Sequence, residues 1–95
     1  MRYGIFCSGG DAMETRVAVI SIIVGEHGDV EQLNHLLHEY GSYIIGRMGI
    51  PYRQRNINII SVVLDAPQNE ISTLAGKIGA LADVTVKTAY SSVQG

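Results

Sequence analysis

The chain has 95 residues, of which 46% are hydrophobic and 17% are charged, and its formal net charge is -2. This length suits one domain with a modest core, and this hydrophobic content excludes a disordered chain. The acidic balance argues against a general nucleic-acid binder, which needs a basic face. A single cysteine cannot form an internal disulfide. We therefore expect a protein of the reducing cytoplasm, and apolar runs shorter than about 18 residues predict no membrane partner.

Residues 1–12 are short and loosely patterned, and Met13 offers a second start-codon position. We therefore expect residues 1–12 to be a flexible extension or a start-site artefact, followed by a single domain over residues 13–95. Cys7 lies in this extension, and no histidine is paired with it in the sequence. We interpret its thiol as incidental rather than catalytic.

The first half of the domain reads as a strand followed by a helix. Residues 16–24, RVAVISIIV, are β-branched almost throughout and predict a strand that stops at a glycine. Residues 29–40 predict a helix because their leucines recur at helical spacing. Asp29 is placed to cap this helix, and Gln32 follows three residues later, as in a capping box.

A hairpin comes next. Residues 42–48 predict a second strand, and residues 49–54, which contain glycine and proline, predict the hairpin loop. Residues 55–65, with INIISVVL as their apolar centre, predict a third strand.

The chain then returns to helix and strand. Pro67 is suited to the first turn of a second helix, which we expect to end near Gly79. Residues 83–90, DVTVKTAY, alternate as a fourth strand does. The order strand, helix, strand, strand, helix, strand predicts an α+β fold, the ferredoxin-like βαββαβ sandwich. Right-handed crossovers place both helices on one face of a four-stranded antiparallel sheet, with the first and third strands central.

Both faces of the two central strands are apolar, although two helices can cover only one face. The face that carries Ser21 and Ser61 is expected to be the uncovered one. A bare apolar face of this size usually marks an interface. The pattern therefore predicts a homo-oligomer, a dimer or tetramer, in which a second subunit covers that face or extends the sheet.

Three segments resemble the family of iron-only hydrogenase system regulators: YGSYIIGRMGIPY, NINIISVVLDAP, and GKIG followed by VTVKT. The resemblance extends over residues 14–92. It implies an ACT-like domain, a small ligand-binding regulatory fold, similar in shape to the metal-sensing C-terminal domain of the nickel-responsive repressor. It implies a transcriptional or metabolic regulator associated with that hydrogenase system. It brings no catalytic residues to carry over. The sequence itself has no recognisable Ser, His and Asp constellation and no glycine-rich phosphate loop, so we expect neither an enzyme nor a cofactor.

The resemblance also indicates where a small-molecule effector would bind. In ACT-like domains effectors sit at subunit interfaces, near the loop between the first strand and the first helix. The corresponding candidates are Gly25, Glu26, His27, Gly28 and Asp29. A glycine at position 28 lets backbone N–H groups approach a ligand, and a helix N-terminus favours an anion. The alternative is a plain strand-to-helix turn capped by an aspartate.

A metal site is a weaker candidate. Glu31, His35 and His38 fall on one stripe of the first helix, and these side chains are ligands for zinc or nickel. The alternative is a solvated helix face with ordinary histidines. The sequence also departs from the nickel repressor because it has no cysteine ligand within the fold.

Three of the seven Lys and Arg residues, Arg47, Arg53 and Arg55, fall on or beside the predicted hairpin. Together they predict a patch for an anion or an acidic partner. Alternatively they are solvated, form contacts between subunits, or protect an edge strand. The sequence has no helix-turn-helix, so direct DNA binding is not expected without a partner protein. The competing interpretations of the whole chain are a non-catalytic protein-interaction module and a metal-binding regulator.

Overall fold

The computed structural model describes residues 14–91, so the predicted N-terminal extension and Cys7 lie outside the described residues. Within this range the chain forms four strands, two α-helices and two short 3-10 helices. In chain order they are β1 (Arg16–Val24), α1 (Val30–Glu39), η1 (Gly41–Tyr43), β2 (Ile44–Tyr52), η2 (Arg53–Arg55), β3 (Ile57–Ala66), α2 (Gln68–Gly79) and β4 (Val84–Tyr90).

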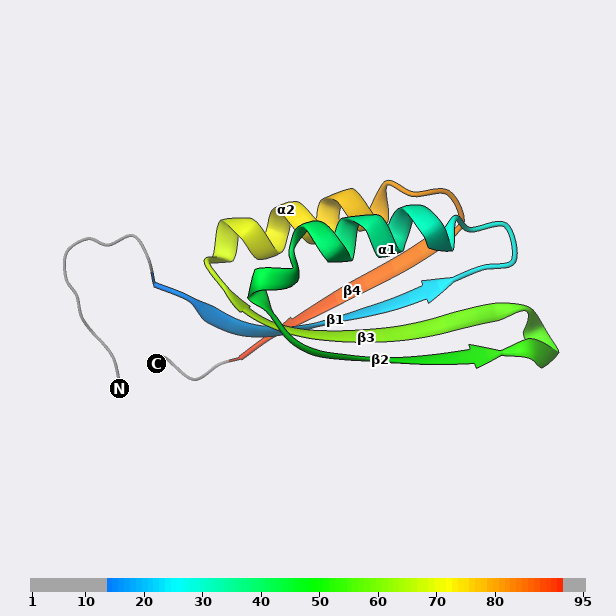
Figure 1. Ribbon diagram of the computed structural model, residues 1–95, viewed down its shortest axis with the longest axis horizontal. Helices are drawn as coiled ribbons and strands as arrows, with labels where there is room; N and C mark the ends of the chain where they lie inside the picture. The colour runs from blue at the N-terminus through cyan, green and yellow to red at the C-terminus, as the bar shows by residue number, and fades with distance from the viewer. Residues whose placement is uncertain (1–13, 92–95) are drawn as a thin grey trace.

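The strands form one antiparallel sheet in the order β2-β3-β1-β4. The two central strands are the two most apolar ones, as predicted. Both helices lie on the same side of this sheet (Figure 1). The ferredoxin-like α+β fold expected from the order of elements is therefore confirmed.

One hydrophobic core fills the space between the helices and the sheet. Each helix contributes three fully or nearly fully buried side chains, namely Leu33, Leu36 and Leu37 from α1 and Ile71, Leu74 and Ile78 from α2. Alternate residues of the central strands meet them, including Ile20, Ile22, Val62 and Leu64. Because each buried aliphatic side chain contributes about 1.5–3 kcal/mol, this layer supplies most of the stability of the fold.

The helix boundaries follow the signals in the sequence. The side chain of Asp29 caps α1 by accepting a hydrogen bond of 3.0 Å from the backbone N–H of Gln32. Pro67 is the N-cap residue of α2, which ends at Gly79 as predicted. These caps fix where the loops on either side of the helices begin.

The hairpin differs from the prediction. The second strand does not span residues 42–48 but runs from Ile44 to Tyr52, and the turn is confined to residues 53–56. Gly49 and Pro51, which were interpreted as loop residues, lie within the strand and face Ile60 and Asn58 of β3. β2 is an edge strand, and proline is tolerated there because its missing N–H can fall on the unpaired side.

No helix or strand among residues 14–91 covers the sheet surface opposite the helices, called here the open face (Figure 1). It carries Ser21 and Ser61, as predicted, with Val17, Ile23 and Ile59 exposed beside them. Met48, Ile50 and Tyr52 of β2 extend it, since they pair with the open-face residues of β3. The homo-oligomer inferred from this pattern stays a prediction.

Neither helix of the described chain has the length and apolar character that a membrane span requires.

Candidate functional site

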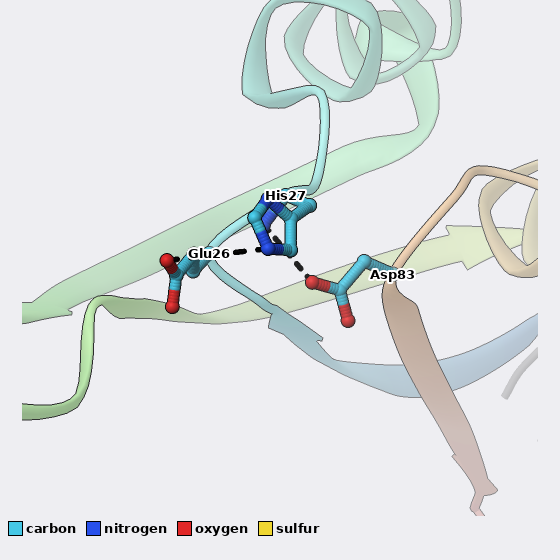
Figure 2. A network of polar contacts seen from close by, with 3 residues as sticks. All are labelled: Glu26, His27 and Asp83. Carbon is cyan, nitrogen blue, oxygen red and sulfur yellow. Dashed lines mark hydrogen bonds and ion pairs between the residues drawn. The ribbon is translucent and has the colours of Figure 1, made fainter.

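The loop between β1 and α1 is tied to the turn that precedes β4. The backbone N–H of Gly25 donates to the carbonyl oxygen of Asp83 at 2.8 Å. The backbone N–H of His27 donates to the Oδ2 atom of Asp83 at 3.0 Å, and Figure 2 shows this carboxylate reaching the loop. A third bond, from the N–H of Gly28 to the carbonyl of Gly25 at 3.0 Å, closes the loop on itself. The loop is therefore held in one conformation by its own chain.

The two glycines of this loop have packing reasons to be glycine. A Cβ atom at Gly25 would lie 2.3 Å from the carboxylate of Asp83, and one at Gly28 would lie 2.3 Å from a methyl group of buried Val24. Such distances are far below van der Waals contact, so a side chain would displace its neighbour. Gly28 thus fits a tight turn, and its contact with a ligand stays a prediction.

The side chains of Glu26 and His27 lie on the solvent side of the loop. The Nε2 atom of His27 is 4.0 Å from the Oε2 atom of Glu26, and both side chains are more than half exposed. Figure 2 shows the two side chains next to each other, with Asp83 on the opposite side of the imidazole. A pair this exposed is worth little to stability, so these groups are free to contact a ligand.

The hairpin turn lies at the same end of the sheet as this loop (Figure 1), because Val24 pairs with Asn58 where β1 ends. Asn56 closes the turn in the left-handed conformation, with a φ of 54°. This conformation suits an asparagine, whose short amide side chain tolerates it.

A shallow hollow lies between the loop and the hairpin. It is lined by Glu26, Pro51, Arg53, Asn56, Ile57 and Asn58. One predicted ligand residue, Glu26, and one predicted patch residue, Arg53, therefore meet on a single surface. Their opposite charges and the two asparagine amides give the hollow both hydrogen-bond donors and acceptors.

The predicted arginine patch is not assembled as a group of three. Arg47 pairs with buried Val62 on the helix-covered side of the sheet. Its guanidinium donates a hydrogen bond of 3.0 Å to the Oδ1 atom of Asn34 on α1. Arg53 and Arg55 lie beyond the end of β2, six and eight residues after Arg47. Arg53 alone of the three lines the hollow.

The histidine stripe is exposed on α1. Glu31, His35 and His38 all face solvent. Among residues 14–91 no three His, Cys, Asp or Glu side chains lie close enough together to hold a metal ion. A metal site on this stripe is thus not preformed.

Sequence reasoning missed three residues of this region, Asp83, Asn56 and Asn58. Asp83 adopts a φ of 57°, and its carboxylate accepts a hydrogen bond from the backbone N–H of His27, which is 56 residues earlier in the chain. An aspartate or asparagine directly before a strand is a signal for a left-handed residue, but nothing local shows which loop it will contact.

The fold and the hollow together define a small ferredoxin-like α+β domain with a candidate binding surface at one end of its sheet. A family model described as iron-only hydrogenase system regulator, TM1266-like, matches residues 16–88. The chain belongs to this family. The resemblance noted in the sequence is thereby confirmed.

Among solved structures, the chain is similar to the protein TM1266 from Thermotoga maritima, which is described as uncharacterized. The two share 36% sequence identity and superpose with a TM-score of 0.78. The match covers 81% of this chain and 98% of that one. A search of the curated proteins finds no match.

Proposed function

We propose that this protein is a non-catalytic regulator in the iron-only hydrogenase system that senses a small ligand in the hollow as an oligomeric ACT-like domain. The observation that carries the proposal is the meeting of Glu26 and Arg53 on one hollow between the β1–α1 loop and the hairpin. The family supports the regulatory role. The cytoplasmic location predicted from composition suits such a role.

The chemistry of the hollow favours a small polar ligand that carries an anionic group. The guanidinium of Arg53 presents paired N–H donors that match a carboxylate or phosphate. Glu26 accepts hydrogen bonds from a ligand amine or hydroxyl group, and the amides of Asn56 and Asn58 can do either. Because the β1–α1 loop is already held by Asp83, little ordering is needed when a ligand contacts Glu26.

The hollow also reaches the surface through which subunits would assemble. Ile57 lines the hollow and, since it pairs with Tyr52, belongs to the open face of the sheet. A ligand in the hollow would therefore touch a residue at the rim of the subunit interface. A ligand that binds the assembled form more tightly shifts the protein toward assembly by its difference in affinity.

A thermal-shift panel tests the proposal. Metal-stripped protein is heated with amino acids, organic acids and nucleotides, each tested separately, and with nickel, zinc and iron salts. A ligand present at about 100 times its Kd stabilises the fold by about 2.7 kcal/mol, which raises Tm by several degrees. Arg53→Gln should abolish the shift, whereas the matched variant Arg47→Gln, away from the hollow, should keep it.

The proposal fails if no organic ligand raises Tm, or if Arg53→Gln and Glu26→Gln leave the shift unchanged. A shift with metal salts alone, abolished by the double variant His35→Ala/His38→Ala, would instead favour a metal-binding regulator.

A second candidate function is a protein-interaction module without a ligand. The exposed apolar side chains of the open face favour it, since large bare apolar patches mark protein contacts. This candidate predicts no shift across the panel. It also predicts that replacing both Arg53 and Arg55 by glutamine weakens capture of an acidic partner protein.

A further inference from the structure

The open face has a polar centre inside an apolar surround. Ser21 of β1 and Ser61 of β3 are directly opposite each other in the two central strands. The ladder of open-face pairs begins at Val17 opposite Asp65 and ends at Tyr52 opposite Ile57. The serine pair lies midway between these ends. The two hydroxyl groups therefore mark the geometric centre of this surface.

The remaining side chains of the open face are the type found in the middle of stable interfaces. Its exposed apolar residues are Val17, Ile23, Met48, Ile50, Tyr52 and Ile59. Its charged residues lie on its edges: Asp65 is in the last rung, and Lys87 is on edge strand β4, where it pairs with Ser21. A mostly apolar surface with charges at its edges is the usual anatomy of a protein interface.

We propose that the open face packs against the open face of a second copy of this chain, around a two-fold axis that passes close to Ser21 and Ser61. This inference rests on the proposed oligomeric regulator and names the surface through which it assembles. In an isologous interface, the residues nearest the axis meet their own counterparts. Four serine hydroxyls then converge at the centre, and each can donate to one neighbour and accept from another.

The size of the face fits a second copy. Four strands about 4.8 Å apart, each spanning about eight residue steps of 3.3 Å, give a footprint of about 500 Å² before side-chain relief is counted. A stable interface takes about 800 Å² of accessible surface from each partner. The flat footprint alone is more than half of that area, and side-chain relief adds to it.

The shape of the face also fits a second copy better than an unrelated partner. Two twisted sheets pack face to face when their strands cross at about 30°, because the twist of each sheet is then matched by the other. A second copy presents a sheet of the same twist and the same apolar surface. The central serines would fix the register of this packing, since any sliding would bury a hydroxyl against aliphatic side chains.

The test measures assembly of the full chain without ligand by sedimentation velocity over a range of concentrations. The wild-type protein should sediment as a dimer or a larger even-numbered assembly. Ile23→Lys should weaken the self-association of the chain by at least a hundredfold, because the ammonium group would be buried at the interface. Thr73→Lys, which adds the same charge on the exposed side of α2, should leave assembly unchanged. Circular dichroism should confirm that both variants are folded.

Cross-linking locates the axis. In a Cys7→Ala background, Ser21→Cys should be joined to its counterpart by a short bismaleimide, and Thr73→Cys should not. A wild-type monomer, assembly that survives Ile23→Lys, or cross-linking at position 73 instead of 21 would overturn the proposal. Because none of these measurements uses a ligand, their outcome is independent of the outcome of the thermal-shift panel.

Discussion

Asp83 and His27 are 56 residues apart, yet the carboxylate of Asp83 accepts a hydrogen bond of 3.0 Å from the backbone N–H of His27. The carbonyl group of Asp83 also binds the N–H of Gly25, so one residue holds both ends of a tight turn. To do this Asp83 adopts a left-handed conformation with a φ of 57°. The candidate binding loop is therefore positioned from the far end of the sequence.

Replacement of Asp83 should loosen this loop. We expect Asp83→Ala to lower the free energy of unfolding by about 1–2 kcal/mol, since it removes an acceptor and places alanine in a left-handed conformation. Asp83→Asn should lower the free energy of unfolding by less than about half as much, because the amide oxygen still accepts the hydrogen bond from His27 and asparagine tolerates this φ. Urea denaturation measures both. Equal losses for the two variants would contradict the role assigned to the hydrogen bond.

Gly28→Ala should destabilise the fold by about 1–3 kcal/mol, because its Cβ would press on a methyl group of Val24 in the core. Gly41→Ala is the matched control, since no atom lies within 4 Å of a Cβ placed there. Its effect on the free energy of unfolding should be within about 0.5 kcal/mol. The midpoints of chemical denaturation compare the two, and a neutral Gly28→Ala would show that the turn has room to relax.

The two glycines of α2 should respond differently to alanine. A Cβ at Gly76 meets no atom within 4 Å, whereas a Cβ at Gly79 would lie 3.2 Å from a methyl group of Val86. Gly76→Ala should therefore stabilise the protein by about 0.5–1 kcal/mol through helix propensity. Gly79→Ala should gain less or lose stability. Thermal unfolding of the two variants measures these stability changes. A larger gain in stability at position 79 than at position 76 would contradict the prediction.

Lys77 should make stability depend on alkaline pH. Its Nζ atom lies over the ring of Tyr40, 5.4 Å from the ring centre. Hydrogen bonding to Tyr40, with a charge interaction with the same residue, raises the pKa of Lys77 above its ordinary value of 10.5. A raised pKa in the folded state means that the contribution is complete below pH 10.5 and is lost as the pH rises through the folded-state pKa.

The difference in unfolding free energy between wild type and Lys77→Met should accordingly be constant up to about pH 10 and shrink above it. Urea titrations between pH 8 and pH 12 measure this difference. A gap that widens with alkaline pH would contradict the assignment.

The fold was predictable because its determinants are periodic. The β-branched run of β1, the leucine spacing of α1 and the Asp29 cap each show in a short window of sequence, and together they set the order of elements. The end of β2 was not predictable in the same way. Glycine and proline at positions 49 and 51 indicate a loop, but an edge strand tolerates both because one of its sides has no partner.

The candidate site was predicted only in pieces. Glu26 and Arg53 were each identified, from the family resemblance and from the clustering of arginines. Their meeting at one hollow depends on the register that pairs Val24 with Asn58. Arg47 lies on the second strand, as predicted, but the register shift between Ile44 and Gly46 turns it to the helix side of the sheet, where it donates a hydrogen bond to Asn34. Pairing register and long-range contacts such as that of Asp83 leave no local signal in the sequence.

The most direct test of ligand sensing is a two-dimensional ¹H–¹⁵N NMR titration of the isotopically labelled chain with any compound that raises Tm in the thermal panel. If the hollow is the binding site, the largest shifts should fall on the amides of Glu26, Arg53, Asn56 and Asn58, which line it. Shifts centred on His35 and His38 of α1, or spread evenly over the sheet, would contradict this proposal.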